Sequence, residues 1–178
     1  IMEGGRINNA VMELLLSNMR VRQERLGDFN SGMAACKTAE RRLNELINRY
    51  GIAPLLDSVN LNLQRSETRM REKIASLPDG DVYYEDYLET FGPDGLESLL
   101  LPLKLSIKGE HLTADFTGAS SQVPAPVNST LAVTAASVFI TLKSALDPKH
   151  ALNHGSFRPV TVIAPEGTIV NVTHPAPA

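Results

Sequence analysis

The residues best suited to chemistry gather near the end of the chain, in residues 153–171. A histidine, an arginine and a glutamate, His154, Arg158 and Glu166, stand here among two glycines and two prolines. Glycine and proline fix the backbone of turns, and polar groups held on such turns commonly bind or transform ligands. The stretch therefore predicts a polar loop cluster built around one short buried strand, 160–163.

Each polar residue in or near this cluster has a chemical and a structural interpretation. The guanidinium of Arg158 fits a carboxylate or a phosphate, and it fits Glu166 or a helix end equally well. Asp115, in the sequence Asp-Phe-Thr-Gly, either supports a cleft or accepts backbone hydrogen bonds in its own loop. Glu166, between a proline and a glycine, is open to the same two interpretations. Three asparagines are turn formers first: Asn128, Asn153 and Asn171.

Familiar catalytic motifs are absent from the sequence. It has no phosphate-binding Gly-Lys-Ser/Thr loop, no G-x-G-x-x-G, no H-E-x-x-H and no G-x-S-x-G. Of the four histidines, His150 and His154 stand four residues apart, but a helix is not expected at residues 153–155, which include His154. We therefore predict no metal site made by this chain alone.

The composition excludes some classes of partner. The chain has 178 residues, 43% hydrophobic and 21% charged, with a net charge of −3 and no basic stripe, so we expect no nucleic acid as partner. Its longest apolar stretch, 131–146, is too short and too polar to span a bilayer. A single cysteine, Cys36, cannot form an internal disulfide and is expected to be packed on a helix. With no signal-peptide pattern, this predicts a cytoplasmic protein.

Apolar residues at helical spacing predict three helices in the first part of the chain. We place them at about 7–19, from Asp28 or Ser31 to 50, and 54–77. The second should bury a stripe, and Gly51 should end it: Cys36, Ala39, Leu43, Leu46, Ile47 and Tyr50. The short link after it predicts an antiparallel hairpin of the second and third helices. The charge-rich residues 65–73 are a solvated face or a docking surface for a partner subunit.

From residue 79 onward, the hydrophobic pattern changes from period 3.6 to period 2. It predicts an antiparallel meander with a turn at 92–95 and with Pro102 at an edge or an irregular start. The predicted elements are strands near 82–87, 101–107, 111–116, 160–163 and 168–171, and a buried helix from Ser129 or Thr130 to 146. The fold class is α+β: a helical segment, 1–78, followed by a small antiparallel sheet, one buried helix and the loop cluster, 79–178.

Several short stretches, by their order and spacing, resemble the hydantoinase B family across nearly the whole chain. They are Gly27-Asp28-Phe29, Ala34-Ala35, Arg41-Arg42-Leu43 to Tyr50-Gly51, Leu77-Pro78-Asp79-Gly80, Leu112 to Gly118, Pro126-Val127-Asn128, and Asn153 to Pro159 through Ala164-Pro165-Glu166-Gly167. The family includes the B-type subunit of ATP-dependent N-methylhydantoinases, the C-terminal half of 5-oxoprolinase and a subunit of acetone and acetophenone carboxylases. Two features depart from its pattern: His154 stands where an acidic residue is frequent, and residues 30–32 replace a longer basic and polar sequence.

The resemblance implies an enzyme that works with an A-type, ATP-using subunit, in which this chain is a fragment of the B-type subunit. The A-type part phosphorylates an amide or enol oxygen, or bicarbonate, and the B-type part completes hydrolysis or carboxylation of a small molecule. A phosphate ester is a leaving group, and the second step needs a metal-bound water and cationic donors. A divalent metal ion is expected from a stretch outside this chain, and a hetero-oligomer that includes the remainder of the same subunit is implied.

Under this resemblance, the candidate catalytic residues are Arg158 as the cation for developing charge, His154 as a proton shuttle and Asp115 at a cleft. The candidate substrate-binding residues are Asn153, Gly155, Asn128 and Glu166. The leading function is ATP-dependent hydrolysis of cyclic amides of the hydantoin or 5-oxoproline type. The corresponding subunit of a ketone carboxylase and a non-catalytic assembly segment remain open alternatives.

Overall fold

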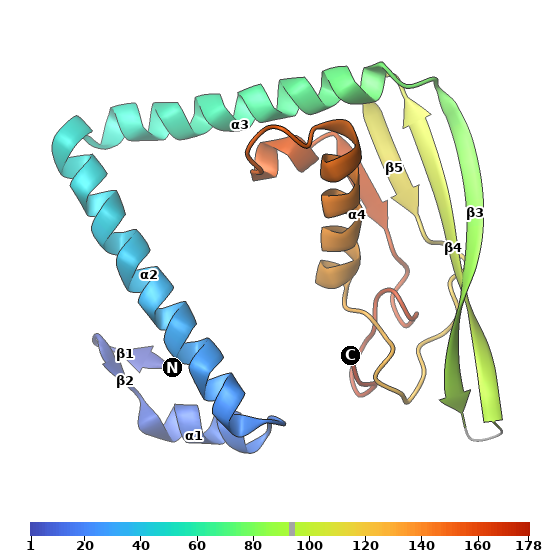
Figure 1. The fold of residues 1–178 in the computed structure, drawn as a ribbon, viewed down its shortest axis with the longest axis horizontal. Helices are drawn as coiled ribbons and strands as arrows, with labels where there is room; N and C mark the ends of the chain where they lie inside the picture. The colour runs from blue at the N-terminus through green and yellow to red at the C-terminus, as the bar shows by residue number, and fades with distance from the viewer. Residues whose placement is uncertain (93–94) are drawn as a thin grey trace. The chain divides into compact units, whose positions relative to one another are not determined.

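The computed structural model describes residues 1–92 and 95–178, and Figure 1 shows the helices and strands of this part of the chain. The residues divide into two compact units, Ile1–Ser58 and Val59–Ala178. Helix α3, Ile52–Ala75, contains the division between them. Among the described residues, none of the helices combines the length and apolarity needed to cross a membrane.

The first unit is helical apart from one short hairpin that the sequence pattern did not predict. Strands β1, Met2–Glu3, and β2, Arg6–Ile7, pair through Gly4 and Gly5, whose positive φ angles of 54° and 78° suit a tight turn. Helix α1, Asn9–Ser17, begins after Asn8, whose side chain accepts a hydrogen bond from the Val11 amide. Helix α2, Arg22–Tyr50, follows and ends at Gly51, as predicted, with a φ of 81°.

Helix α2 differs from the prediction at its start and in its burial. It begins at Arg22 rather than at Asp28 or Ser31, so the polar residues before Gly27 belong to the helix. The prediction of a buried stripe is wrong: none of the residues of α2 is buried in the described part of the chain, and Cys36 and Leu43 are exposed. Helical periodicity identifies an apolar face, but not what covers it. Antiparallel packing of α2 against α3 stays a prediction.

The second unit is built on a sheet with the strand order β3-β4-β5-β6. The strands are β3, Gly80–Gly92, β4, Gly95–Lys108, β5, His111–Asp115, and β6, Val160–Ile163. The first three pair antiparallel, as predicted. Strand β6 pairs parallel with β5, so the prediction of a purely antiparallel sheet is wrong. The predicted turn at 92–95 includes Pro93 and Asp94, which lie outside the described residues.

Pro102 lies within β4, at a point where the strand is paired on one side only. Strand β5 pairs with residues 104–108 of β4, so Pro102 lies beyond the end of β5. The Leu100 amide donates to Ser120 Oγ, away from β3, and Pro102 has the same orientation because strand residues alternate with period 2. The missing N–H of proline therefore falls on the side where β4 has no neighbouring strand, as the predicted edge position requires.

Helix α4, Leu131–Leu146, has the predicted bounds and begins after Thr130, whose side chain accepts from the Val133 amide. The expectation that it is buried all round is wrong, because Val133 and Ile140 are 57% and 59% exposed. Residues 168–171 do not form the predicted strand. Thr168 makes isolated bridges to Ser121 and Asn171, which hold a turn.

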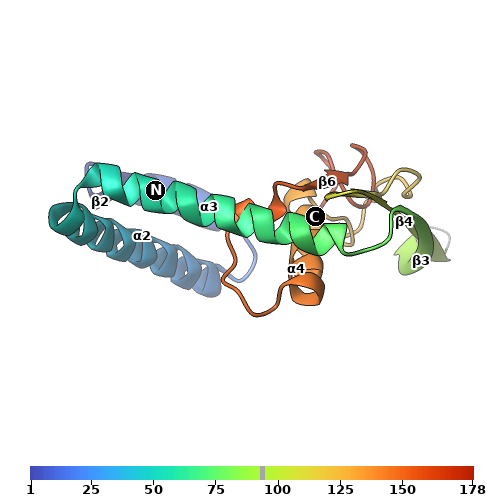
Figure 2. The same ribbon diagram turned by 90° about the horizontal axis from the view of Figure 1, so that it is seen from above.

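Two groups of apolar residues pack on the sheet. One joins the turn residues Ile169 and Val170 to Ala114 and Phe116. The other joins α3 to β5 and β6 through Met70, Ile74, Leu112 and Val160, with residues of α4 around them. Figure 2 shows α3 passing over the C-terminal end of α4. The part of α3 after Val59 is therefore integral to the core of the second unit.

This packing predicts unequal effects of two leucine-sized truncations on α3. Ile74 is 0% exposed, and Ile74→Ala should lower the free energy of unfolding by about 2–4 kcal/mol, through lost burial and the cavity left behind. Leu61 is 46% exposed, and Leu61→Ala should change it by less than about 0.5 kcal/mol. Urea unfolding followed by circular dichroism measures both. Equal losses would contradict the packing of α3 on the sheet.

Candidate functional site

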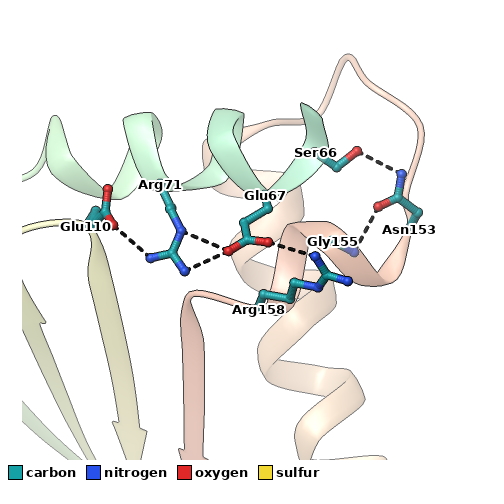
Figure 3. Close-up of polar contacts among 7 residues, drawn as sticks. All are labelled: Ser66, Glu67, Arg71, Glu110, Asn153, Gly155 and Arg158. Carbon is teal, nitrogen blue, oxygen red and sulfur yellow. Dashed lines mark hydrogen bonds and ion pairs between the residues drawn. The ribbon is translucent and has the colours of Figure 1, made fainter. Parts of the chain in front are cut away.

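The centre of the predicted loop cluster is a short 3-10 helix, η1, His154–Phe157. Asn153 precedes it and accepts a hydrogen bond from the Gly155 amide through its side-chain oxygen, at 2.9 Å. Its side-chain nitrogen donates to Ser66 Oγ on α3, at 2.8 Å. One asparagine side chain therefore starts η1 and ties it to α3 (Figure 3).

Gly155 brings η1 against the backbone of α3. A Cβ atom at this position would lie 2.0 Å from the carbonyl oxygen of Leu63, well inside van der Waals contact. Gly155 and Ser156 are both buried. The sequence pattern made Gly155 a candidate for substrate binding, but its geometry gives it the role of a close-packing residue, because no side chain fits between the two elements.

Arg158 completes the attachment with an ion pair. Its Nη1 donates to Glu67 Oε2 on α3 at 2.9 Å, and the arginine side chain is 41% exposed. Glu67 Oε1 accepts from Arg71 Nη2 at 2.8 Å, and Arg71 Nη1 donates to Glu110 Oε1 at 3.0 Å. Figure 3 shows this chain of alternating charges running along α3. The sequence suggested Glu166 or a helix end as the partner of Arg158. In the structure its partner is Glu67.

The network sets the ionisation of its central carboxylate. Hydrogen bonds from Arg158, and then from Arg71, hold the pKa of Glu67 below its ordinary value of 4.5, against a smaller opposing effect of burial. Glu67 therefore stays ionised at neutral pH. Its charge fixes one edge of the Arg158 guanidinium and leaves the exposed part of that group open to solvent.

The other face of η1 rests on α4. The rings of Phe157 and Phe139 stack with centroids 4.3 Å apart and planes 15° apart. The hydroxyl of Ser156 is buried and has no hydrogen-bond partner among the described residues. His154, at the start of η1, is exposed.

Asp115 and Glu166 lie at the opposite end of the parallel strand pair from Arg158. Asp115 is level with Ile163, the last residue of β6, whereas Arg158 precedes the first. Three residues of parallel strand span about 10 Å, so Asp115 does not converge with Arg158. Asp115 Oδ1 accepts from the Thr117 amide at 2.8 Å, which is the loop-capping alternative. Glu166 is exposed in the turn beyond β6.

Asn128 is a buried connector. Its side chain accepts from the Val123 amide at 2.9 Å and donates to the carbonyl oxygens of Val123, Ala125 and Pro177 at 2.8, 2.9 and 2.6 Å. These bonds involve both the nitrogen and the oxygen of the side chain, so Asn128 joins neighbouring loops in the way that the turn-forming interpretation expects. Asn171 similarly donates to Ala164 O at 2.8 Å.

A buried charge pair at the end of α4 was not foreseen in the sequence. Lys143 Nζ bonds Asp147 Oδ2 at 2.7 Å and the Asp147 backbone oxygen, and His150 Nδ1 bonds Asp147 Oδ1. Burial alone raises the pKa of Asp147, but the hydrogen bonds from Lys143 and His150 outweigh it, so the net pKa lies below its usual range. The group closes the C-terminus of α4 and fixes the loop that leads to η1.

The residues missed by sequence reasoning lie on α3. Residues 65–73 were interpreted as a solvated face or a docking surface, but Ser66 and Met70 are buried, and Glu67 and Arg71 are only 22% exposed at their side chains. The near-heptad spacing of Leu63, Met70 and Ile74 was the available signal that this part of α3 is buried.

In residues 1–92 and 95–178, no cluster of three or more histidine, cysteine, aspartate or glutamate residues could hold a metal ion.

Two glycine substitutions test the contact between η1 and α3. Gly155→Ala should lower the free energy of unfolding by about 1–3 kcal/mol, because the new Cβ forces η1 away from α3. Gly32→Ala, on α2 where a Cβ meets nothing within 4 Å, should be neutral or stabilise by up to about 1 kcal/mol. Thermal unfolding of both variants measures the two changes in stability. A Gly155→Ala variant as stable as the parent protein would refute the close approach.

The lowered pKa of Glu67 predicts a pH-dependent contribution to stability. A carboxyl group with a depressed folded-state pKa stabilises the fold fully above its unfolded value, here 4.5, and loses that contribution as pH falls through the folded value. Glu67→Gln should therefore be less stable than the parent protein at pH 7, with the difference shrinking below pH 4.5. Urea midpoints across this range measure it. A difference that is constant with pH would contradict the charged network.

Proteins of one family are similar to this chain over nearly its whole length. The family model for hydantoinase B/oxoprolinase matches residues 1–178. The B component of a putative D-/L-hydantoinase from a Pseudomonas species (strain NS671) is 31% identical over 181 residues, which cover 96% of this chain and 30% of that protein. The beta component of the caprolactamase of Pseudomonas jessenii is 31% identical over 176 residues, covering 97% and 30%.

Solved structures give the same relation. The crystal structure of the ATP-dependent caprolactamase from Pseudomonas jessenii matches with a TM-score of 0.84 and 30% identity, over 98% of this chain and 30% of that one. A nucleotide-free acetone carboxylase structure matches with a TM-score of 0.84 and 14% identity, over 97% and 24%, which shows a shared fold. This chain thus spans about a third or less of the proteins it matches. It belongs to the hydantoinase B/oxoprolinase family.

Proposed function

We propose that this chain is part of the B-type subunit of an ATP-dependent amidohydrolase that opens cyclic amides. The observation that carries the proposal is the match to the ATP-dependent caprolactamase, at 30% identity over 98% of this chain with a TM-score of 0.84. Caprolactam, hydantoins and 5-oxoproline share a cyclic amide bond, so relatives named for these substrates support one reaction class.

The chemistry of an amide explains why ATP would be needed. An amide carbon is a poor electrophile, because the nitrogen donates electrons to the carbonyl group. Phosphorylation of the amide oxygen by an A-type partner subunit would make that carbon open to attack by water. The C–N bond would then break with a proton transferred to the nitrogen, and a second water would hydrolyse the remaining acyl phosphate to carboxylate and phosphate. The site that finishes hydrolysis then requires an activated water and positive charge near the developing negative charge. In this proposal, a divalent metal ion bound by residues outside this chain activates the water.

Arg158 is the residue of this chain best placed to supply the positive charge. Glu67 holds one edge of its guanidinium, and 41% of the side chain remains exposed. Glu67 acts as a positioning residue in this scheme, and exposed His154, four residues earlier, would move a proton. Asn153 and Gly155 would act by seating η1 on α3, and Asp115, Asn128 and Glu166 by shaping the surrounding loops.

The corresponding subunit of a ketone carboxylase is the second candidate, favoured by the acetone carboxylase fold match at the same TM-score. The sequence identity of 30% to the caprolactamase, against 14% to the carboxylase, supports amide hydrolysis as the first candidate. Substrate-stimulated ATP hydrolysis by the full complex separates the two. We expect stimulation by lactams or hydantoins; stimulation only by acetone or acetophenone with bicarbonate would replace the first candidate by the second.

Substitution of Arg158 tests the role of this chain in the reaction. Arg158→Ala in the full complex should lower kcat by about 100-fold or more, the usual effect of removing one donor to developing charge. The matched control is Arg41→Ala, which removes an exposed ion pair with Glu45 on α2 and should leave kcat unchanged. Circular dichroism checks that both variants fold. Unchanged turnover in folded Arg158→Ala would favour a non-catalytic assembly role.

A further inference from the structure

Strand β3 forms one edge of the sheet along its whole length. It pairs with β4 on one side, over an unbroken register from Gly80–Ile107 to Gly92–Gly95, and it is the first strand in the sheet order. Its other side has no neighbouring strand in the part of the chain that the structure describes (Figure 1). Such an edge presents a row of backbone donors and acceptors to solvent.

The register identifies which backbone groups face outward. Leu100 on β4 exchanges hydrogen bonds with Ser120, so its N–H and C=O point away from β3. In an antiparallel pair, residues directly opposite each other share this orientation, so Tyr87, opposite Leu100, points its backbone groups outward too. The backbone N–H of Tyr87 donates a hydrogen bond to the side-chain oxygen of Asp86. Because the pattern repeats every second residue, the other outward amides in the central part are those of Tyr83, Glu85 and Glu89.

The edge carries large exposed side chains and lacks the lysine, proline and bulge that would block an added strand. Val82, Tyr83, Tyr84 and Tyr87 are 65%, 58%, 66% and 58% exposed. Natural edge strands are commonly protected by lysine, proline or a bulge. The sequence of β3 has neither lysine nor proline, and its register with β4 has no bulge. Exposed tyrosines are typical of binding surfaces, because they bury a large area at low conformational cost.

The charge of the edge selects the chemistry of its partner. Strand β3 carries four acidic residues and no basic one. Asp81 is neutralised by Lys104 at 2.8 Å, whereas Glu85, Asp86 and Glu89 form no ion pair with the described residues. A second copy of this chain would set the same acids against one another, which disfavours edge-to-edge self-pairing. A segment rich in lysine or arginine would pair with the acids, and its cations would also stack on the tyrosine rings.

We propose that the outer edge of β3 is a docking site for an extended, basic polypeptide segment, which joins the sheet as an added strand. Backbone hydrogen bonds to the outward groups of β3 would set its register. Contacts with the acids and tyrosines would select its sequence. This interaction surface is independent of the reaction assigned to the complex.

The test uses the full-length subunit and a synthetic peptide of about ten residues that alternates lysine and threonine. A glutamate and threonine peptide is the control. We expect the basic peptide to bind, less tightly at higher salt, and to slow amide exchange at Tyr83, Glu85 and Glu89 but not at Tyr84, whose amide already faces β4. Glu85→Lys with Glu89→Lys should weaken binding about tenfold or more through like-charge repulsion. Glu40→Lys, on α2, should not.

A pair of variants at one position isolates the backbone contact. Tyr83→Pro removes an outward N–H without touching the β3–β4 hydrogen bonds, whereas Tyr83→Thr keeps it and removes only the ring. Binding should be weaker in the proline variant than in the threonine variant, with circular dichroism unchanged in both. Equal binding by these two variants, binding of the acidic peptide, protection elsewhere on the subunit, or self-association through β3 would each overturn the proposal.

Discussion

The seating of η1 on α3 is the constraint on which the rest of the site depends. Gly155 approaches the Leu63 carbonyl so closely that no side chain fits between them. Asn153 and Arg158, on either side of that contact, bond Ser66 and Glu67 of α3. Three consecutive features of the loop thus fix its position, orientation and charge, and β6 begins directly after them. The position of this loop is set by a helix about ninety residues earlier in the chain.

The candidate residues that the sequence grouped together have different structural roles. Asn128 uses its amide to hold neighbouring loops together, Asp115 caps a turn, and Gly155 provides space. Glu67 holds Arg158 while much of the arginine side chain stays exposed. A guanidinium fixed at one edge is the preorganised arrangement that the proposed charge-stabilising role requires. The chain belongs to the hydantoinase B/oxoprolinase family, and the proposed role of this arrangement is argued from that membership.

Short-range sequence patterns predicted much of the fold, but they did not predict the contacts that build the site. Helix spacing, a cap at Ser129 or Thr130 and the alternation in residues 101–107 predicted elements that the structure contains, because these signals act within a few residues. The parallel pairing of β6 and the exposure of α2 depend on distant partners, which one sequence does not specify. Glu67 was missed for the same reason. It stands in a charged run that resembles a solvated face, and its partner Arg158 is far away in sequence.

The claim that the ion pair between Glu67 and Arg158 holds the loop on α3 is tested most directly by a double-mutant cycle. Urea midpoints would be measured for the parent protein, Glu67→Ala, Arg158→Ala and the double variant, at neutral pH. A direct interaction predicts that the double variant is little less stable than the weaker single variant, since the same contact is lost in each. If the two single effects instead add fully, then the residues act independently, and η1 is held on α3 by other means.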